Sequence, residues 1–136
     1  MADVLTAAER RRNMAAIRGR DTKPELTVRS FLHRMGYRYI LHDRSLPGRP
    51  DLSFPSRRKV IFVHGCFWHM HHCKYGQVRP ATNAAFWQVK RAANVERDAL
   101  VERELQDLGW DIIVTWECEL RDVHALARRL IRFLEA

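Results

Sequence analysis

The segment VIFVHGCFWHMHHC, residues 60–73, joins an apolar run to a dense group of metal-binding and aromatic side chains. Residues 60–63 have the composition of a buried β-strand. The ten residues that follow hold four of the chain's seven histidines, two of its three cysteines and an adjacent Phe-Trp pair. The segment therefore predicts a central strand that ends in a loop with metal-binding and ring-stacking chemistry.

Length and composition limit the class of protein. The 136 residues suit one domain, and the 46% hydrophobic and 10% aromatic content excludes a disordered or fibrous protein. No apolar run approaches the roughly 20 residues that cross a bilayer, and the first residues lack the apolar core of a secretory signal. We therefore expect a single cytoplasmic domain over residues 1–136, without a membrane partner.

The charge balance favours a polyanionic partner. The chain has 24 basic and 16 acidic residues, which gives a formal net charge of +8. A field of this sign attracts nucleic acid. A basic protein without such a partner is the alternative that charge alone leaves open.

Periodicity predicts elements in the order α-α-β-β-β-α-β-α. Helices are expected at residues 7–19, 21–36, 83–108 and 122–134, and strands at 37–41, 51–54, 59–65 and 110–117, the last being the clearest buried strand. In the second helix Thr22 is the expected N-cap and Glu25 follows it three residues later, while Gly109 ends the third helix. This order predicts an α/β fold with a central mixed sheet flanked by helices. The first helix belongs to a basic N-terminal arm, residues 1–20.

Cysteine and histidine spacing predicts a metal site that links two distant segments. Cys66, His71 and Cys73 lie within eight residues, and Cys118 follows the last predicted strand. An odd number of cysteines does not suit a disulfide framework, whereas thiolates and an imidazole in a closed tetrahedron suit zinc. Such a zinc has no open position, so its role is structural. The alternative is that Cys66 and Cys118 are small buried apolar residues.

Asp51 and two further histidines are candidates for catalysis. Asp51 stands at the start of a predicted strand, and the next predicted strand begins about ten residues later. A carboxylate there can hold Mg²⁺ against a phosphate, although Pro-Asp is also common in turns. His64 and His69, which the zinc cluster does not use, suit proton transfer near neutral pH. Ordinary surface or core histidines are the alternative.

Six segments resemble the very short patch repair endonucleases, bacterial enzymes that nick DNA beside a thymine-guanine mismatch. They are RRNMAAIRGRDTKPE, SLPGRPDLSF, VIFVHGCFWHMHHC, ATNAAFW, NVERD and LGWDIIVTWEC. The likeness extends from about Arg10 to Cys118, and its most specific part is residues 60–73. Nothing after about Leu120 is diagnostic. The resemblance implies a restriction-endonuclease-like core.

The resemblance also implies roles for individual residues. Asp51 would be the magnesium ligand and His69 the general base that activates the attacking water. His64, Glu25 and Asp98 would have supporting roles, and zinc would have the same four ligands that the spacing predicts. From the residues alone, Glu25 is equally a helix-capping residue, and Asp98 equally a member of a solvated ion pair.

Position 63 departs from the expected pattern. Restriction-type nucleases usually carry an acid and a lysine on the second strand, where this chain reads FVHG, residues 62–65. Members of the family often have Thr in place of Val63. If the backbone carbonyl of residue 63 contacts Mg²⁺, Val is harmless, because every residue supplies that oxygen. If a hydroxyl is required, Val63 does not supply it. We favour the carbonyl.

Three aromatic residues, Phe67, Trp68 and Trp87, are predicted to enter the DNA. Rigid aromatics on a basic surface can wedge between base pairs, at a cost of about a few kcal/mol that is lower at a mispair. Stacking the exposed bases returns about 1–3 kcal/mol per base. The alternative for Phe67 and Trp68 is burial in the core.

The resemblance points the same three aromatics at the DNA and places Met14 and Ile17 in the opposite, minor groove. The alternative for Met14 and Ile17 is packing onto the core. Phosphate contacts are expected from the arginines around them. These are Arg10, Arg11, Arg12, Arg18 and Arg20.

The family resemblance, together with these features, implies one function. The chain would hydrolyse one strand 5′ of the thymine in a T:G mismatch, with Mg²⁺ in catalysis and Zn²⁺ in the structure. Such mismatches arise when 5-methylcytosine deaminates, so a cytosine-5 DNA methyltransferase and mismatch-repair or repair-synthesis proteins are expected partners. Nicking one strand needs only one active site, so we expect a monomer. We expect it to associate with the bacterial nucleoid. The alternatives are a catalytically inactive zinc-containing DNA-binding module and a restriction-type nuclease for matched DNA.

Overall fold

The computed structural model describes residues 22–136 of the chain. The predictions for the 1–20 arm, including Met14, Ile17 and the neighbouring arginines, concern residues outside this range. The elements are α2 (Lys23–Arg34), β1 (Ile40–Leu41), β2 (Leu52–Phe54), β3 (Lys59–His64), α3 (Ala84–Asp107), β4 (Asp111–Trp116), the 3₁₀ helix η1 (Glu117–Asp122) and α4 (Val123–Glu135). No helix among them is long and apolar enough to cross a membrane.

The strands form one mixed sheet in the order β1-β2-β3-β4. The pairs β1/β2 and β2/β3 are antiparallel, with Leu52 opposite Ile61. The pair β3/β4 is parallel, with Val63 opposite Thr115. Parallel strands need a long crossover, which α3 and the loop before it provide. The predicted mixed sheet between helices is therefore confirmed.

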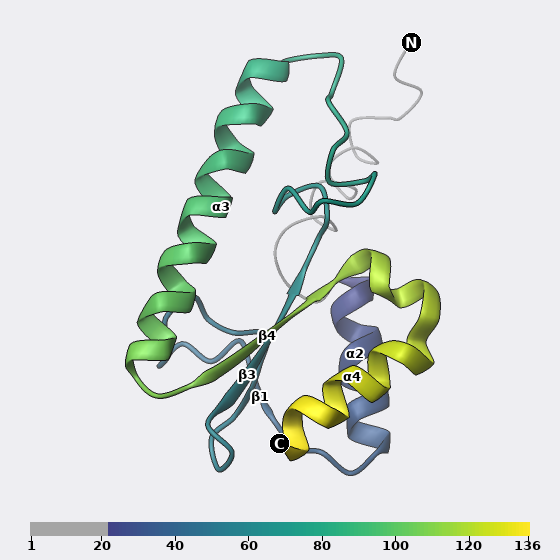
Figure 1. Ribbon diagram of the computed structural model, residues 1–136, viewed down its shortest axis with the longest axis vertical. Coiled ribbons are helices and arrows are strands. Elements are labelled where there is room, and N and C mark those ends of the chain that lie inside the picture. Colours follow the sequence, from purple (N-terminus) through teal and green to yellow (C-terminus); the bar gives the residue numbers. More distant parts are fainter. Residues whose placement is uncertain (1–21) are drawn as a thin grey trace, which may run out of the picture.

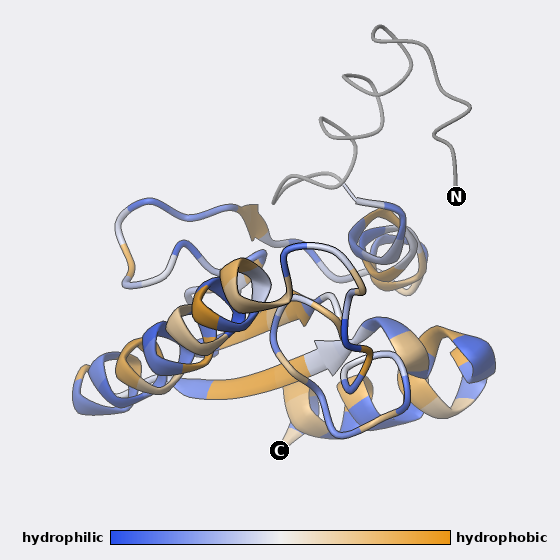
Figure 2. Cartoon of the chain, turned by 90° about the horizontal axis from the view of Figure 1, so that it is seen from above, coloured by the Kyte–Doolittle hydropathy of each residue, from blue (hydrophilic) through white to orange (hydrophobic). Residues whose placement is uncertain are grey.

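The sheet lies between α3 on one side and α2 and α4 on the other (Figure 1), and alternating side chains of β3 pack into two separate hydrophobic clusters. Ile61 packs with residues of α2 and α4, such as Phe31 and Leu130, on one face of the sheet. On the other face, Val60 and Phe62 pack with Leu105 of α3. Figure 2 shows hydrophobic strands between the helices, whereas α3 carries hydrophilic and hydrophobic residues around its circumference. The central strand is thus covered on both faces.

Two predicted strands differ from the observed ones. The strand expected at 110–117 is mostly half-buried rather than buried, because β4 lies at the edge of the sheet. The strand expected at 37–41 pairs only at Ile40–Leu41. Tyr37 and Tyr39 instead pack their ring edges against Phe54, with centroids 6.4 and 5.9 Å away. Packing of these rings replaces the expected strand pairing.

The loop at residues 42–50 is held close to α3. Gly48 has a φ of +74°, and a Cβ atom there would lie 2.4 Å from Cγ1 of Val101. Only glycine suits both the left-handed backbone and this close approach. The contact brings the loop before β2 close to the end of the sheet at which β3 and β4 terminate.

Candidate active site

Glu25 contributes its backbone to a helix cap and its carboxylate to a polar cluster. Thr22 caps α2 as predicted, since its hydroxyl oxygen accepts a hydrogen bond from the Glu25 N–H at 3.4 Å. The carboxylate of Glu25 accepts a 2.9 Å bond from Nη2 of Arg29 and lies 2.6 Å from Nε2 of His42. Glu25 is only 1% exposed. The side chain of Glu25 is thus part of a buried network.

Asp51 completes this cluster at the start of β2. Its Oδ2 accepts a 2.6 Å hydrogen bond from the N–H of Val63, and its Oδ1 lies 3.9 Å from Nε2 of His42. Burial raises the pKa of Asp51 to about 8, and its hydrogen bond with Glu25 acts in the same direction. The neutral form of one carboxyl is therefore favoured in the absence of a cation.

Glu25, His42 and Asp51 can hold a metal ion. One ligand atom from each lies within 4.8 Å of the others. Asp51 and Glu25 were predicted at this site, but His42 was not. In the sequence, His42 is a single histidine at the start of a turn-rich loop. The loop places it in the cluster with a left-handed backbone, φ of 47°, which no local pattern predicts.

A second cluster joins the end of β3 to α3. Nδ1 of His69 lies 2.6 Å from Oδ2 of Asp98, and the rings of His69 and His64 stack with centroids 3.8 Å apart and planes 4° apart. Asp98 therefore contacts His69 rather than forming only a solvated pair with its helix neighbours. Burial, together with the nearby His69, lowers the pKa of His64 to about 4, so His64 is neutral at physiological pH.

The two clusters line the same pocket of about 900 Å³. Phe67 and Trp68 line it too, so Asp51 and the predicted wedge face one cavity. Basic side chains surround the same space, and such charges suit a phosphate backbone. They are Lys23, Arg44, Arg49, Lys90 and Arg97.

The three predicted wedge residues form one aromatic cluster. The ring centroids of Phe67 and Trp68 are 5.3 Å apart, those of Trp68 and Trp87 are 5.2 Å apart, and those of Phe67 and Trp87 are 6.0 Å apart. All three side chains are half-buried. Full burial of Phe67 and Trp68 in the core, the alternative from the sequence, is therefore wrong.

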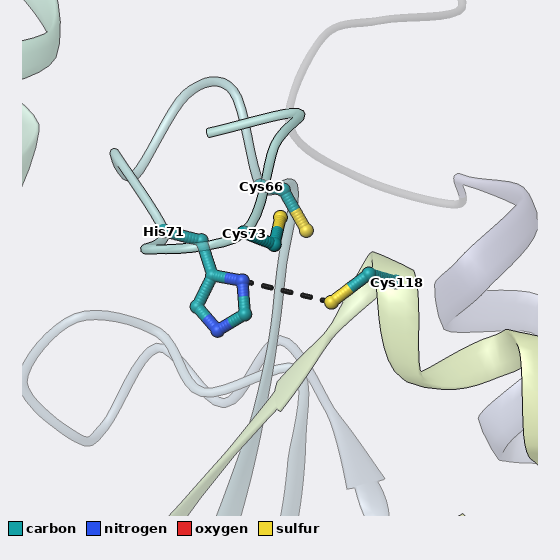
Figure 3. Close-up of side chains that lie close together, drawn as sticks. All are labelled: Cys66, His71, Cys73 and Cys118. Atoms are coloured by element: carbon teal, nitrogen blue, oxygen red, sulfur yellow. Dashed lines mark hydrogen bonds between the residues drawn. The ribbon is translucent and has the colours of Figure 1, made fainter. Parts of the chain in front are cut away.

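The predicted zinc ligands lie together. Figure 3 shows Cys66, His71 and Cys73 of the loop after β3 facing Cys118, which follows β4. One ligand atom from each lies within 4.8 Å of the others, and Sγ of Cys118 is 3.6 Å from Nδ1 of His71. Zinc bonds of normal length in a tetrahedron separate sulfur and nitrogen by about 3.6 Å. The four donors therefore fit a closed zinc site.

The thiols of this cluster differ in acidity. Burial raises the pKa of Cys66 to about 12. Burial acts in the same direction on Cys73, but hydrogen bonds with the His71 side chain and the Gly76 backbone outweigh it and lower the pKa of Cys73 to about 6. A bound cation would favour the thiolate form of all the cysteines.

Comparisons with known proteins agree with this geometry. A family model described as DNA mismatch endonuclease Vsr matches residues 2–75. The chain is 50% identical over 121 residues to the DNA mismatch endonuclease Vsr of Escherichia coli strain K12. This alignment covers 89% of this chain and 77% of that protein. It is 48% identical over 135 residues to the type II nicking enzyme V.XorIIP of Xanthomonas oryzae pv. oryzae, covering 99% of this chain and 98% of that protein.

A third relative is the type II nicking enzyme V.NmeAIP of Neisseria meningitidis, 40% identical over 98% of this chain and 95% of that protein. The mixed α/β architecture is consistent with the restriction-endonuclease-like core that the resemblance implied. The family model matches more than half of the chain, and the relatives align with most of it. The chain therefore belongs to the Vsr family of DNA mismatch endonucleases and is a DNA endonuclease.

Proposed function

We propose that this endonuclease nicks one DNA strand 5′ of the thymine in a T:G mismatch by Mg²⁺-dependent hydrolysis. The observation that carries the proposal is the shared pocket: potential cation ligands, the His69–Asp98 pair and two wedge aromatics all line it. A site for chemistry and a site for opening the duplex are thus adjacent. The names of the relatives, a mismatch endonuclease and nicking enzymes, support both halves of the proposal.

In this proposal Asp51 and the carbonyl of Val63 hold Mg²⁺, with Glu25 close by. The N–H of Val63 already points at Asp51, and the N–H and C=O of one strand residue point toward the same neighbour. The half-buried Val63 side chain packs against the core beside α2 and α4. When bound, Mg²⁺ would polarise the phosphate and neutralise its charge.

His69 is the proposed general base. If Asp98 accepts the proton of Nδ1, the other ring nitrogen of His69 is left to accept a proton from water. The stacked ring of His64 fixes the plane of His69, and its low pKa avoids a second positive charge beside the base. General-base catalysis of this kind contributes about 10²–10⁴-fold to a rate.

The aromatic cluster is the proposed reader of the mismatch. Phe67, Trp68 and Trp87 are partly exposed and held edge to face, so inserting them requires little ordering. Stacking returns about as much free energy as opening a weakened step costs. The family resemblance adds Met14 and Ile17 from the minor groove and phosphate contacts from Arg10, Arg11, Arg18 and Arg20.

We also propose that zinc fills the four-ligand cluster and has a structural role. It would tie the loop that carries Phe67 and Trp68 to the segment after β4. The whole chain, residues 1–136, would act as one domain and as a monomer in the cytoplasm at the nucleoid. Because the substrate comes from deaminated 5-methylcytosine, a cytosine-5 DNA methyltransferase and mismatch-repair or repair-synthesis proteins would act before and after it.

Asp51→Ala is expected to abolish nicking while binding to a T:G duplex persists. Loss of the metal-binding carboxylate should lower the single-turnover rate about 10³-fold or more. The matched control is Asp107→Ala, at the exposed end of α3, which should nick normally. Nicking at the normal rate by Asp51→Ala would remove this metal site from the mechanism.

His71→Ala is expected to lose zinc, whereas His72→Ala should keep it. His72 is the adjacent histidine but does not belong to the four-ligand cluster. Metal analysis of the purified proteins should find close to one zinc per chain in His72→Ala and far less in His71→Ala. The melting temperature of His71→Ala should fall by about 5 °C or more. Equal zinc in both variants would contradict the assignment.

Magnesium affinity should rise with pH and become constant above about pH 8. The pKa of Asp51 is raised to about 8, so at lower pH a proton must leave before Mg²⁺ binds. The affinity should fall about tenfold per pH unit below this value. Calorimetric titrations at pH 6, 7 and 8 test this, and Glu25→Gln should move the dependence to lower pH. An affinity that is constant from pH 6 to 8 would refute it.

A further inference from the structure

Arg91 of α3 has no role in the function described so far, yet it is almost completely buried. Only 3% of it is exposed. Its Nε donates a 2.7 Å hydrogen bond to the carbonyl of Phe67, its Nη1 donates a 3.0 Å bond to the carbonyl of Val78, and its Nη2 donates to the carbonyl of Gly76. One guanidinium thus binds three backbone oxygens of the loop between β3 and α3.

The same guanidinium also contacts an aromatic ring. Its central carbon lies 4.3 Å from the centroid of Phe67. Within residues 22–136, Arg91 forms no ion pair with a carboxylate. Its buried charge is therefore balanced by carbonyl oxygens and by the negative face of the ring. Two of these contacts, to the carbonyl and to the ring of Phe67, hold that residue.

We propose that Arg91 is the positioning residue for the aromatic wedge and thereby sets the preference for mismatched over matched DNA. The inference rests on the proposed function, in which Phe67, Trp68 and Trp87 enter the duplex. Trp87 and Arg91 are four residues apart on α3, so they share a face of the helix. The helix thus supplies one ring of the wedge and holds a second through Arg91.

Neighbouring contacts join the aromatic wedge to the loop that carries Cys66, His71 and Cys73. Asn94, one turn after Arg91, donates a 3.0 Å hydrogen bond from Nδ2 to the carbonyl of Trp68. Gly76, which Arg91 also binds, donates its N–H to the carbonyl of Cys73 at 3.1 Å. A Cβ atom at Gly76 would lie 1.9 Å from the His71 carbonyl oxygen, so the loop closes tightly there. Arg91 therefore connects α3 to the wedge and to the predicted zinc ligands.

The effect of Arg91 should appear in discrimination rather than in general DNA affinity. Non-specific affinity comes from exposed charges that contact phosphates, and Arg91 is not exposed. Lys at this position keeps the charge, but a single ammonium group cannot reproduce the planar fork that binds three carbonyls. Arg91→Lys therefore changes the position of Phe67 while the net charge stays the same.

The test compares Arg91→Lys with Arg103→Lys, an exposed position on the same helix. For Arg91→Lys, the Kd for a T:G duplex should rise about tenfold while the Kd for the matched duplex stays within about twofold, because misplacing one ring forfeits most of a stacking contribution. Arg103→Lys should change neither value. Equal loss on both duplexes, or an unchanged ratio of the two Kd values, would overturn the inference.

A double-mutant cycle separates positioning from general stability. In a Trp68→Ala background, Arg91→Lys should have little further effect on the ratio of the two Kd values, whereas independent effects would add. If Trp68→Ala does not change that ratio, the aromatic cluster does not read the mismatch, and the proposed function is refuted as well. If Trp68→Ala changes it and Arg91→Lys does not, only the role of Arg91 is refuted.

A measurement on the unaltered protein applies even if Arg91→Lys does not fold. In isotope-labelled protein, the Nε–H of Arg91 should exchange slowly with solvent, because it is buried and bonded to the Phe67 carbonyl. Its slow exchange should persist when a T:G duplex is added. Fast exchange in the complex would show that Arg91 does not hold the wedge there and would overturn the inference.

Discussion

The pairing of β3 with both of its neighbours, β2 and β4, is the constraint on which the candidate metal clusters depend. The register runs from Lys59 opposite Asp111 to His64 opposite Trp116, so both strands end at the same edge of the sheet. The chain segments that carry the predicted zinc ligands leave from this edge. The antiparallel pairing of β2 with β3 brings Asp51 there as well. A shift in the β2/β3 register would separate Asp51 from the histidines that follow β3, and a shift in the β3/β4 register would separate Cys118 from the other three predicted zinc ligands.

Several groups at this edge are arranged for function at a cost in stability. Glu25 and Asp51 are carboxyls close together in a buried place, and their proximity together with burial favours the neutral form of one of them. His64 is buried and neutral, and Arg91 is a buried cation without a carboxylate partner in residues 22–136. A divalent cation bound between Glu25 and Asp51 would compensate part of this cost.

The sequence predicted the features that have local signals. The apolar run of β3, the cap at Thr22 and the stop at Gly109 are all found, and the cysteine count and spacing identified a cluster whose members lie together. The role of His42 was not predictable, because it depends on the path of the 42–50 loop over α3. Arg91 was also missed, since a buried arginine has the same local pattern as an exposed one on a helix with little apolar periodicity.

Cleavage of end-labelled duplexes with Mg²⁺ tests the central claim that a wedge and a metal-dependent active site share one pocket. One duplex should contain a T:G mismatch and the other a matched C:G pair in the same flanking sequence, with each strand labelled in turn. We expect a single nick, 5′ of the mispaired thymine and in that strand alone. Cutting of both strands, or equal cutting of the matched duplex, would contradict it.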